Sequence, residues 1–205
     1  MFNLIKKSKK RIEHWTPHYI FNRINLFFTE KMNPDWPWLT KDAVKILNQL
    51  LKKDDVGLEF GSGRSTVWLA KKVKKIISIE DDKNWFKKIQ KDLNDKNLNN
   101  VDYKFKSPKE YTFDGIEDES IDFVLVDGQF RDLCVEKSIS KIKKGGLIII
   151  DNINRYVPNI SHSPGSIRDN FASDIWQDIF LNKIKNWRCV WTTNGVTDTL
   201  ILFKS

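Results

Sequence analysis

The sequence predicts a doubly wound α/β fold whose mostly parallel sheet ends in an antiparallel hairpin. Short strands that are apolar on both faces alternate with amphipathic helices, and this alternation is typical of a parallel sheet covered by helices. Glycines mark the turn between the first strand of this series and the helix that follows it. The last two predicted strands are separated by five residues, which are too few for the crossover that a parallel pair requires.

The composition is that of one globular domain. The chain has 205 residues, of which 40% are hydrophobic and 30% charged, so collagen-like, coiled-coil and disordered classes are excluded. No apolar run reaches the roughly 18 residues that a membrane span needs. Two cysteines, Cys134 and Cys189, are too few for a disulfide scaffold or a cysteine-based zinc site. We therefore expect a reducing, cytoplasmic setting.

The net charge of +8 does not by itself indicate a nucleic-acid partner. Most of the positive charge is carried by lysines that are spread along the chain in short pairs. Arginine is the usual residue for bidentate contacts with bases and phosphates, and a binding surface requires its cations to be clustered. The composition therefore favours a small-molecule substrate over nucleic acid.

Residues 1–39 are predicted to form an N-terminal arm that precedes the main domain of residues 40–205. The arm contains many aromatic residues without a clean period, and its densest basic cluster lies within residues 6–11. After two prolines a helix is expected, with Thr40 as its N-cap. Its apolar residues recur at the spacing of one buried helix face. They are Ala43, Val44, Leu47, Leu50 and Leu51.

From residue 56 onwards, buried strands and amphipathic helices alternate. The apolar runs predict strands at residues 56–60, 76–80, 101–105, 121–126 and 147–150. The segments between them carry apolar residues on one side and predict helices at residues 64–73, 83–94 and 131–143. Residues 188–193 and 199–203 form a predicted hairpin, because Asn194-Gly195 is a strong turn signal.

The glycine-rich turn after the first strand is the candidate ligand site. Gly61 and Gly63 allow a ligand to approach the backbone closely, and the N-terminus of the next helix favours a polar or negatively charged group. Glu59 ends the first strand, and Glu80 ends the second strand, 19 positions after Gly61. An acid at the second place can hydrogen-bond both hydroxyls of an adenosyl ribose.

Two alternatives concern the acids and the ligand. Glu80 could instead cap the next helix, together with Asp81 and Asp82. A dinucleotide is the rival ligand, but its G-x-G-x-x-G fingerprint would place its third glycine at Thr66. Glu59 would also repel a pyrophosphate. A cofactor with an ammonium group and no phosphate suits Glu59 better, and S-adenosylmethionine is such a cofactor.

The segment Glu59-Phe60-Gly61-Ser62-Gly63-Arg64-Ser65-Thr66 resembles the first motif of the class I S-adenosylmethionine-dependent methyltransferases. Asp127 resembles that family's fourth-strand motif, and the hairpin resembles its reversed seventh strand. The resemblance implies a Rossmann-like, seven-stranded sheet and an S-adenosylmethionine-binding enzyme. It also implies that Glu80 holds the ribose and that Asp81 lies near the adenine. The cofactor-binding residues implied are Glu59, Gly61, Ser62, Gly63, Arg64, Ser65, Thr66, Glu80, Asp81 and Asp127.

Shorter motifs are similar to those of a narrower group. Pro37-Trp38-Leu39-Thr40, Gly63-Arg64-Ser65-Thr66 and Val126-Asp127-Gly128-Gln129-Phe130-Arg131 resemble segments of small uncharacterised bacterial methyltransferases. Ser65 stands where many members have a third glycine, and a serine there can cap the helix.

The ends of the fourth and fifth strands carry the candidate catalytic and metal residues. Asp127, Asp151 and Asn152 resemble the metal ligands of the catechol-type O-methyltransferases, and hard oxygen ligands suit an optional Mg²⁺. That family has a lysine where this chain has Phe130, and the charged Arg131 cannot act as a base. The alternative is that Asp127 faces the cofactor while Asp151 and Asn152 cap the following loop.

His162, in the long loop after the fifth strand, is a candidate general base with an unperturbed pKa near 6.5, and the alternative is a solvated loop histidine. We expect catalytic roles for Asp127, Asp151 and His162 in methyl transfer to an oxygen or nitrogen of a small or medium-sized substrate. Two other functions remain open. One is an RNA methyltransferase that uses the basic surface, and the other is a binding module that kept the fold without catalysis.

Overall fold

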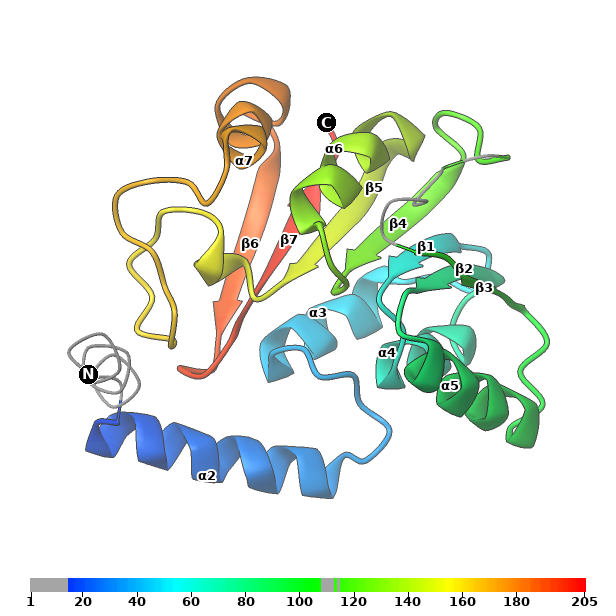
Figure 1. Ribbon diagram of the computed structural model, residues 1–205, viewed down its shortest axis with the longest axis horizontal. Helices are drawn as coiled ribbons and strands as arrows, with labels where there is room; N and C mark the ends of the chain where they lie inside the picture. The colour runs from blue at the N-terminus through cyan, green and yellow to red at the C-terminus, as the bar shows by residue number, and fades with distance from the viewer. Residues whose placement is uncertain (1–14, 108–112, 114) are drawn as a thin grey trace.

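The computed structural model describes residues 15–107, 113 and 115–205, and it confirms the predicted fold class (Figure 1). One sheet contains seven strands in the order β3-β2-β1-β4-β5-β7-β6. Only β7 is antiparallel to its neighbours, so the other six strands share one direction. The strands are β1 (Val56–Phe60), β2 (Lys75–Glu80), β3 (Val101–Phe105), β4 (Ile121–Val126), β5 (Ile142–Asp151), β6 (Arg188–Thr193) and β7 (Asp198–Phe203).

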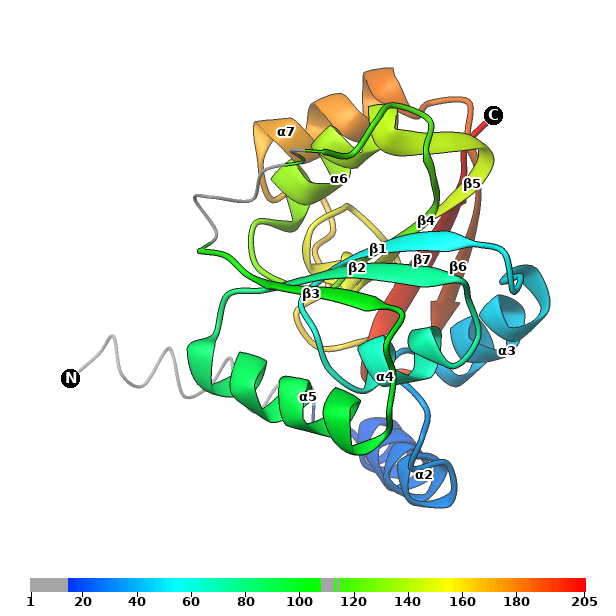
Figure 2. The ribbon, with the colours of Figure 1, turned by 90° about the vertical axis from the view of Figure 1, so that its right-hand side faces the viewer.

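Helices cover both faces of the sheet, with α3, α4 and α5 on one side and α6 and α7 on the other (Figures 1 and 2). Each face buries its own apolar cluster. Phe60 and Trp176 belong to one, and Trp68 and Phe123 belong to the other. The helical elements are α2 (Pro17–Met32), α3 (Lys41–Leu50), α4 (Arg64–Ala70), α5 (Lys83–Asp95), α6 (Arg131–Lys141), η2 (Ile153–Arg155), α7 (Asp174–Asp178) and the π-helical η3 (Ile179–Lys183).

Three local predictions at element ends are wrong. α4 ends at Ala70, because the amide of Lys72 donates to the carbonyl of Leu69 in a tight final turn that leads back to β2. α6 gives way at Ile142 to β5, which is longer than predicted because Ile142 pairs with Ile121 ahead of the glycine pair. Ser65 does not cap α4, since it lies inside the helix and Gly63 occupies the N-cap position.

The arm contains a helix that its sequence did not reveal. Thr16 accepts a hydrogen bond from the amide of Tyr19 and caps α2, and Pro17 occupies the first helical position. No residue of α2 is buried, and most of its large apolar side chains are exposed, with Leu26 half-buried. The helix therefore lacks the core-facing apolar stripe from which a helix is usually recognised. The basic cluster of residues 6–11 lies outside the described residues.

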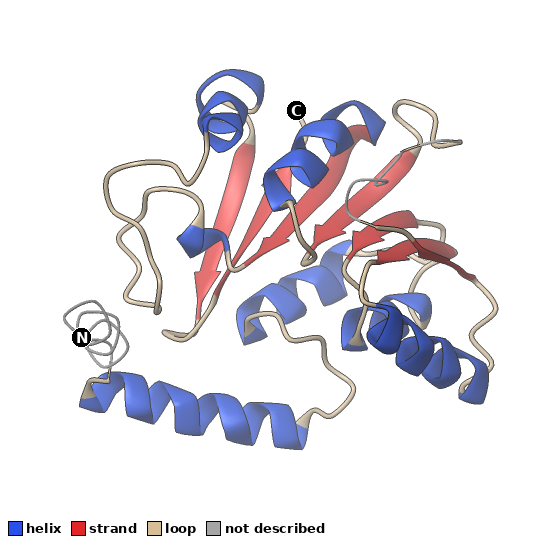
Figure 3. Cartoon of the chain, viewed as in Figure 1, coloured by secondary structure: helices blue, strands red, loops and turns tan. Residues whose placement is uncertain are grey.

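Thr40 joins the arm to the domain, and it is the N-cap of α3 as predicted. Its hydroxyl bonds the hydroxyl of Thr192, and its amide donates to Oγ1 of Thr199. The start of α3 is thereby fixed to the β6–β7 hairpin. Figure 3 shows the loops that follow β4 and β5 at the edge of the sheet that faces α2. None of the helices among the described residues has the length and apolar content needed to cross a membrane.

Candidate functional site

The two glycines of the turn after β1 differ in whether packing requires a glycine at their position. Gly61 has a φ of +85°, and a Cβ on it would lie 2.6 Å from the backbone nitrogen of Gly128, in the turn after β4. A larger residue cannot be accommodated there. A Cβ on Gly63 would meet only the ring of Trp85, at 4.0 Å. Packing does not require a glycine at position 63, and its absent side chain leaves open space at the N-terminus of α4.

Glu80 holds the glycine turn in place. Its Oε2 accepts hydrogen bonds from the amide of Ser62, at 2.8 Å, and from the hydroxyl of Ser62, at 2.6 Å. Its Oε1 accepts from the amides of Asp81 and Asp82, both at 2.9 Å. The cap of α5 is Asp82, which accepts from the amides of Asn84 and Trp85. Glu80 is therefore not needed as a helix cap, and its carboxylate joins the end of β2 to the turn.

Glu59 is a fully buried carboxyl group beneath the turn. Its Oε2 accepts hydrogen bonds of 2.6 Å from the hydroxyls of Thr66 and Ser78. Its Oε1 is buried and has no partner among the described residues. Burial raises the pKa of Glu59 to about 7, against the lowering effect of the hydroxyls around it. A cation at Oε1 would meet this unused acceptor and restore the charge.

Two further charged side chains near the turn have a buried atom without a partner among the described residues. These atoms are Nη1 of Arg64 and Oδ2 of Asp81. The guanidinium of Arg64 lies 5.2 Å from the ring centroid of Trp38, and burial raises the pKa of Asp81. With Glu59, the turn therefore has one cationic and two acidic groups with unused hydrogen-bonding capacity. A ligand with an ammonium, a carboxylate and further donors would satisfy all three.

The ends of β4 and β5 are joined by Arg131. Its Nη2 donates to the carbonyl of Asp127, at 2.8 Å, and to Oδ1 of Asp127, at 2.7 Å. Its Nη1 donates to the carbonyl of Asp151, and its Nε donates to the carbonyl of Gly128 at 3.0 Å. The arginine is 10% exposed, so the pair with Asp127 is largely shielded from solvent on that side. Arg131 thus occupies the cationic position between the two strand ends.

Asp151 is almost fully buried at this junction. Its Oδ1 accepts from the hydroxyl of Thr199, at 3.1 Å, and its Oδ2 accepts from the amide of Asn152, at 2.6 Å. Burial, with the nearby charge of Asp127 as a further cause, raises the pKa of Asp151 to about 7. The Asn152 amide also donates to Oγ1 of Thr197, so this side chain connects β5 to the hairpin.

The predicted Mg²⁺ ligands do not fit a metal in this arrangement. Asp127 is paired with Arg131, and Asn152 presents its amide NH₂, a donor, to Asp151. Among the described residues there is no group of three or more histidine, cysteine, aspartate and glutamate side chains that could hold a metal ion. A guanidinium fills the place that the prediction gave to the cation.

His162 has no hydrogen bond to the other predicted catalytic residues in the described part of the chain. It is exposed, whereas the next residue, Ser163, is buried and donates to Oδ1 of Asp198 at the start of β7. Asn154 anchors the same loop by donating to Oγ of Ser166, at 3.0 Å. No hydrogen bond among the described residues fixes the tautomer of His162.

The predicted cofactor residues do lie together. The turn of Gly61 packs on the turn after β4, and the amide of Asp127 donates to the carbonyl of Phe60 at 2.8 Å. The role of Arg131 was missed at the sequence level, although its i, i+4 spacing from Asp127 was a usable signal. The rings of Trp38 and Trp85 stack beside the turn with their centroids 6.4 Å apart, and no pattern in the neighbouring sequence indicated this contact.

No family model matches the sequence, and no curated protein matches it. Solved structures do resemble its fold. An rRNA methylase from Streptococcus thermophilus matches with a TM-score of 0.56 at 15% identity, over 78% of this chain and 93% of the other. The chain has the class I methyltransferase fold. A precorrin-6y C5,15-methyltransferase from Geobacter metallireducens matches with a TM-score of 0.56 at 16% identity, over 82% of this chain and 90% of the other.

A third match to this methyltransferase fold comes from Streptococcus mutans, and that protein was solved in complex with SAH, the demethylated form of S-adenosylmethionine. Its TM-score is 0.54 at 16% identity, over 83% of this chain and 99% of the other. At these identities the comparisons describe the fold, and the chemistry of this chain has to be argued from its own residues.

Proposed function

We propose that the protein is an S-adenosylmethionine-dependent methyltransferase that acts on an oxygen or nitrogen of a small or medium-sized acceptor. The observation that carries the proposal is the trio of charged groups at the glycine turn with unpartnered buried atoms, Glu59, Arg64 and Asp81. Glu59 would bind the ammonium of the cofactor, Arg64 its carboxylate and Asp81 its adenine side. When bound, S-adenosylmethionine supplies a methyl group on a positively charged sulfur.

Glu80 supports the same proposal through the arrangement of its contacts. Its Oε1 is engaged by two backbone amides, which orient the carboxylate from below. Its Oε2 accepts from the amide of Ser62 and from the hydroxyl of Ser62, which also lies 2.7 Å from the hydroxyl of Tyr103. A ribose hydroxyl would take the place of the Ser62 hydroxyl without disturbing the backbone contacts. Gly63, which packing does not require, would leave room for the cofactor above the turn.

On the acceptor side, Asp151 is the proposed proton acceptor. A carboxyl group with a pKa of about 7 can take a proton from a hydroxyl or amine near neutral pH. Arg131 would hold the two strand ends at a constant separation, and Asp127 would remain its ion-pair partner. His162 lacks an orienting partner among the described residues and receives no role in this proposal. Catalysis would depend mainly on the positioning of the acceptor.

We infer that this site works without Mg²⁺, because Arg131 already neutralises Asp127. Calorimetric titration of Mg²⁺ into the protein with SAH bound is expected to give no heat at millimolar concentration, and the activity is expected to be indifferent to a chelator. Saturable heat that Asp127→Asn removes would contradict this inference.

The cofactor assignment is tested by calorimetry with SAH, S-adenosylmethionine and NAD. The first two are expected to bind and NAD is not. Arg64→Met should weaken SAH binding by roughly 10–100-fold, because one charge-assisted hydrogen bond is worth about 1.5–3 kcal/mol. Arg188→Met, on exposed edge strand β6, is the matched control and should bind as the unaltered protein does. NAD binding, or SAH binding that Arg64→Met leaves unchanged, would overturn the assignment.

The role of Asp151 needs a separate experiment. Asp151→Asn should lower kcat by roughly 10²–10⁴-fold and remove the acidic limb of the pH profile, while SAH affinity stays the same. A lower kcat with an unchanged pH profile would show that Asp151 has only a structural role and does not accept the proton.

A further inference from the structure

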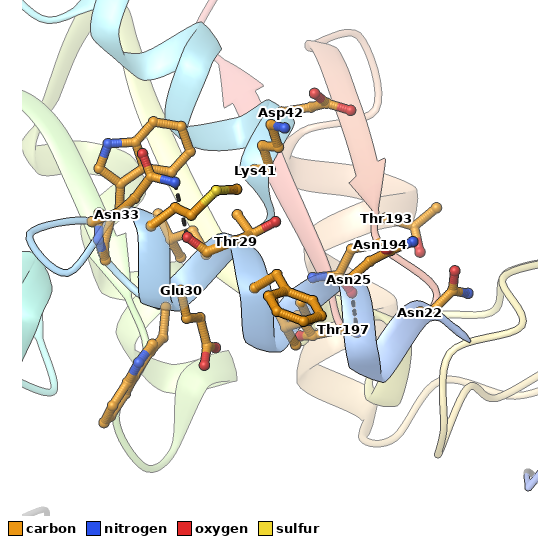
Figure 4. A pocket seen from close by; sticks show the side chains of 17 residues that line it. Asn22, Asn25, Thr29, Glu30, Asn33, Lys41, Asp42, Thr193, Asn194 and Thr197 are labelled. Atoms are coloured by element: carbon orange, nitrogen blue, oxygen red, sulfur yellow. Dashed lines mark hydrogen bonds between the residues drawn. The ribbon is translucent and has the colours of Figure 1, made fainter. Parts of the chain in front are cut away.

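A cavity of about 510 Å³ lies between α2, the segment before α3 and the β6–β7 hairpin (Figure 4). Its walls come from parts of the chain that are far apart in the sequence. The α2 side contributes three uncharged polar side chains at i, i+3 and i+7, which is one face of a helix. The uncharged polar side chains on these two walls are Asn22, Asn25 and Thr29 from α2 and Thr193, Asn194 and Thr197 from the hairpin.

The cavity adjoins the proposed acceptor side of the site. Thr197 lines the cavity, and its hydroxyl accepts a hydrogen bond from the amide of Asn152. The same amide donates to Oδ2 of Asp151, at 2.6 Å. One side chain therefore separates the cavity wall from the proposed proton acceptor.

The side of α2 that borders the cavity is mixed, because Leu26, Phe28 and Met32 line the cavity together with polar side chains. Its polar residues face the cavity, as Figure 4 shows for Asn22, Asn25 and Thr29. Phe21 and Ile24 are 60% and 49% exposed and do not line the cavity. No residue of α2 is buried, so the helix gains little from packing on the domain. The polar side chains that border the cavity therefore point to a ligand with polar groups in that space.

The polar groups of the cavity have unused capacity. Among the described residues, the amides of Asn22 and Asn25 make no hydrogen bond, and Nδ2 of Asn194 is buried without a partner. An amide side chain both donates and accepts, as does a ligand hydroxyl. Phe28 and Trp36 add aromatic surface beside these groups, against which the C–H face of a sugar ring can pack.

The charge of the lining argues against an anionic ligand. Glu30 and Asp42 line the cavity with one cation, Lys41. The lining is therefore slightly acidic, whereas a site for phosphates or for an RNA backbone requires clustered cations.

We propose that this cavity is the acceptor-binding subsite and that it takes a neutral, hydroxyl-rich ligand, namely a glycosyl unit. The inference rests on the proposed function for its place in the reaction, but the binding of the sugar is a separate property. The amides of α2 and the hairpin bind the hydroxyls of the ring. The aromatic side chains bind its apolar face, and the β5 edge receives the hydroxyl nearest to Asp151.

The test uses the full chain labelled with ¹⁵N at its tryptophan indoles, with Trp36→Phe to assign the Trp36 signal. The probes are methyl glycosides of neutral hexoses, deoxyhexoses and N-acetylhexosamines, compared with glucose 6-phosphate and with catechol. At least one neutral glycoside is expected to shift the Trp36 indole signal saturably. Asn25→Leu should weaken that binding by about tenfold or more, because a sugar hydroxyl loses its partner. Ile24→Ala, on the outward side of α2, is the matched control and should leave it unchanged.

SAH is titrated into the same samples, so that the two proposals can fail separately. If SAH binds and no glycoside shifts the Trp36 signal, the glycosyl subsite is wrong and the methyltransferase function stands. If a glycoside binds and SAH does not, the sugar site stands and the proposed function is wrong. Tighter binding of glucose 6-phosphate or catechol than of every neutral glycoside would also overturn the inference, as would glycoside binding that Asn25→Leu does not weaken.

Discussion

Replacing Glu59 by glutamine should remove a specific part of the pH dependence of stability. Glu59 is fully buried, and burial raises its pKa from 4.5 to about 7. Between these two pH values, the folded protein holds a proton that the unfolded chain has lost. The free energy of unfolding therefore falls as the pH rises from about 4.5 to about 7, and the loss persists above that range.

The size of this effect follows from the two pKa values. The difference between 4.5 and about 7 corresponds to about 3 kcal/mol, at about 1.4 kcal/mol per pH unit. Glu59→Gln has nearly the same shape and stays neutral, so its stability should lack this decline. Asp151, whose pKa is also raised to about 7, contributes to both proteins alike and cancels in the comparison.

The assay is urea unfolding of the ligand-free protein, followed by circular dichroism, at pH 5, 6, 7 and 8. Between pH 5 and pH 8 the unaltered protein should lose about 2.5 kcal/mol more than Glu59→Gln, because part of the decline already lies below pH 5. Glu136→Gln, at a partly exposed ion pair, is the control and should follow the profile of the unaltered protein. Parallel profiles for Glu59→Gln and the unaltered protein would refute the reasoning.

Three further outcomes are expected. In urea unfolding, Gly61→Ala should lower the free energy of unfolding by roughly 2–5 kcal/mol, because the φ of +85° and the close packing at this position exclude a Cβ. Gly63→Ala should change that free energy by less than about 1 kcal/mol but weaken SAH binding in calorimetry, and a larger loss of stability for Gly63→Ala than for Gly61→Ala would contradict this. Arg131→Leu removes a charge that lowers the pKa of Asp151, so urea unfolding should show a larger loss of stability at pH 8 than at pH 6, and an equal loss would count against that role. Deleting residues 1–11 should change the calorimetric SAH affinity by less than about twofold, and lost binding would disprove their dispensability.

Much of the fold of residues 40–205 could be predicted from local sequence patterns. The first strand, its glycine turn and the final hairpin were all predicted from neighbouring residues, because burial on both faces, a strand-to-helix turn and an Asn-Gly pair each leave a signal within a few positions. The class of ligand followed in the same way from Glu59 and Glu80, since carboxyl ends of parallel strands must meet at one edge of the sheet.

The helix α2 and the contacts of Glu80 could not be predicted from local sequence patterns. α2 has no core-facing stripe, so periodicity could not reveal it. The Glu80 carboxylate could be placed at the end of β2, but its bonds to Ser62 depend on how the turn folds back on that strand.

The sequence by itself determined the α/β class, the direction of the hairpin and the glycine turn with its acids, because these depend on residues that are close in the chain. The tertiary structure alone decided that Arg131 joins the ends of β4 and β5 through its hydrogen bonds to Asp127 and Asp151. It also decided that α2 faces the hairpin across a cavity lined by both polar and apolar side chains. Both arrangements depend on strand pairing and packing between segments far apart in the chain, and no local spacing encodes the distance between such segments.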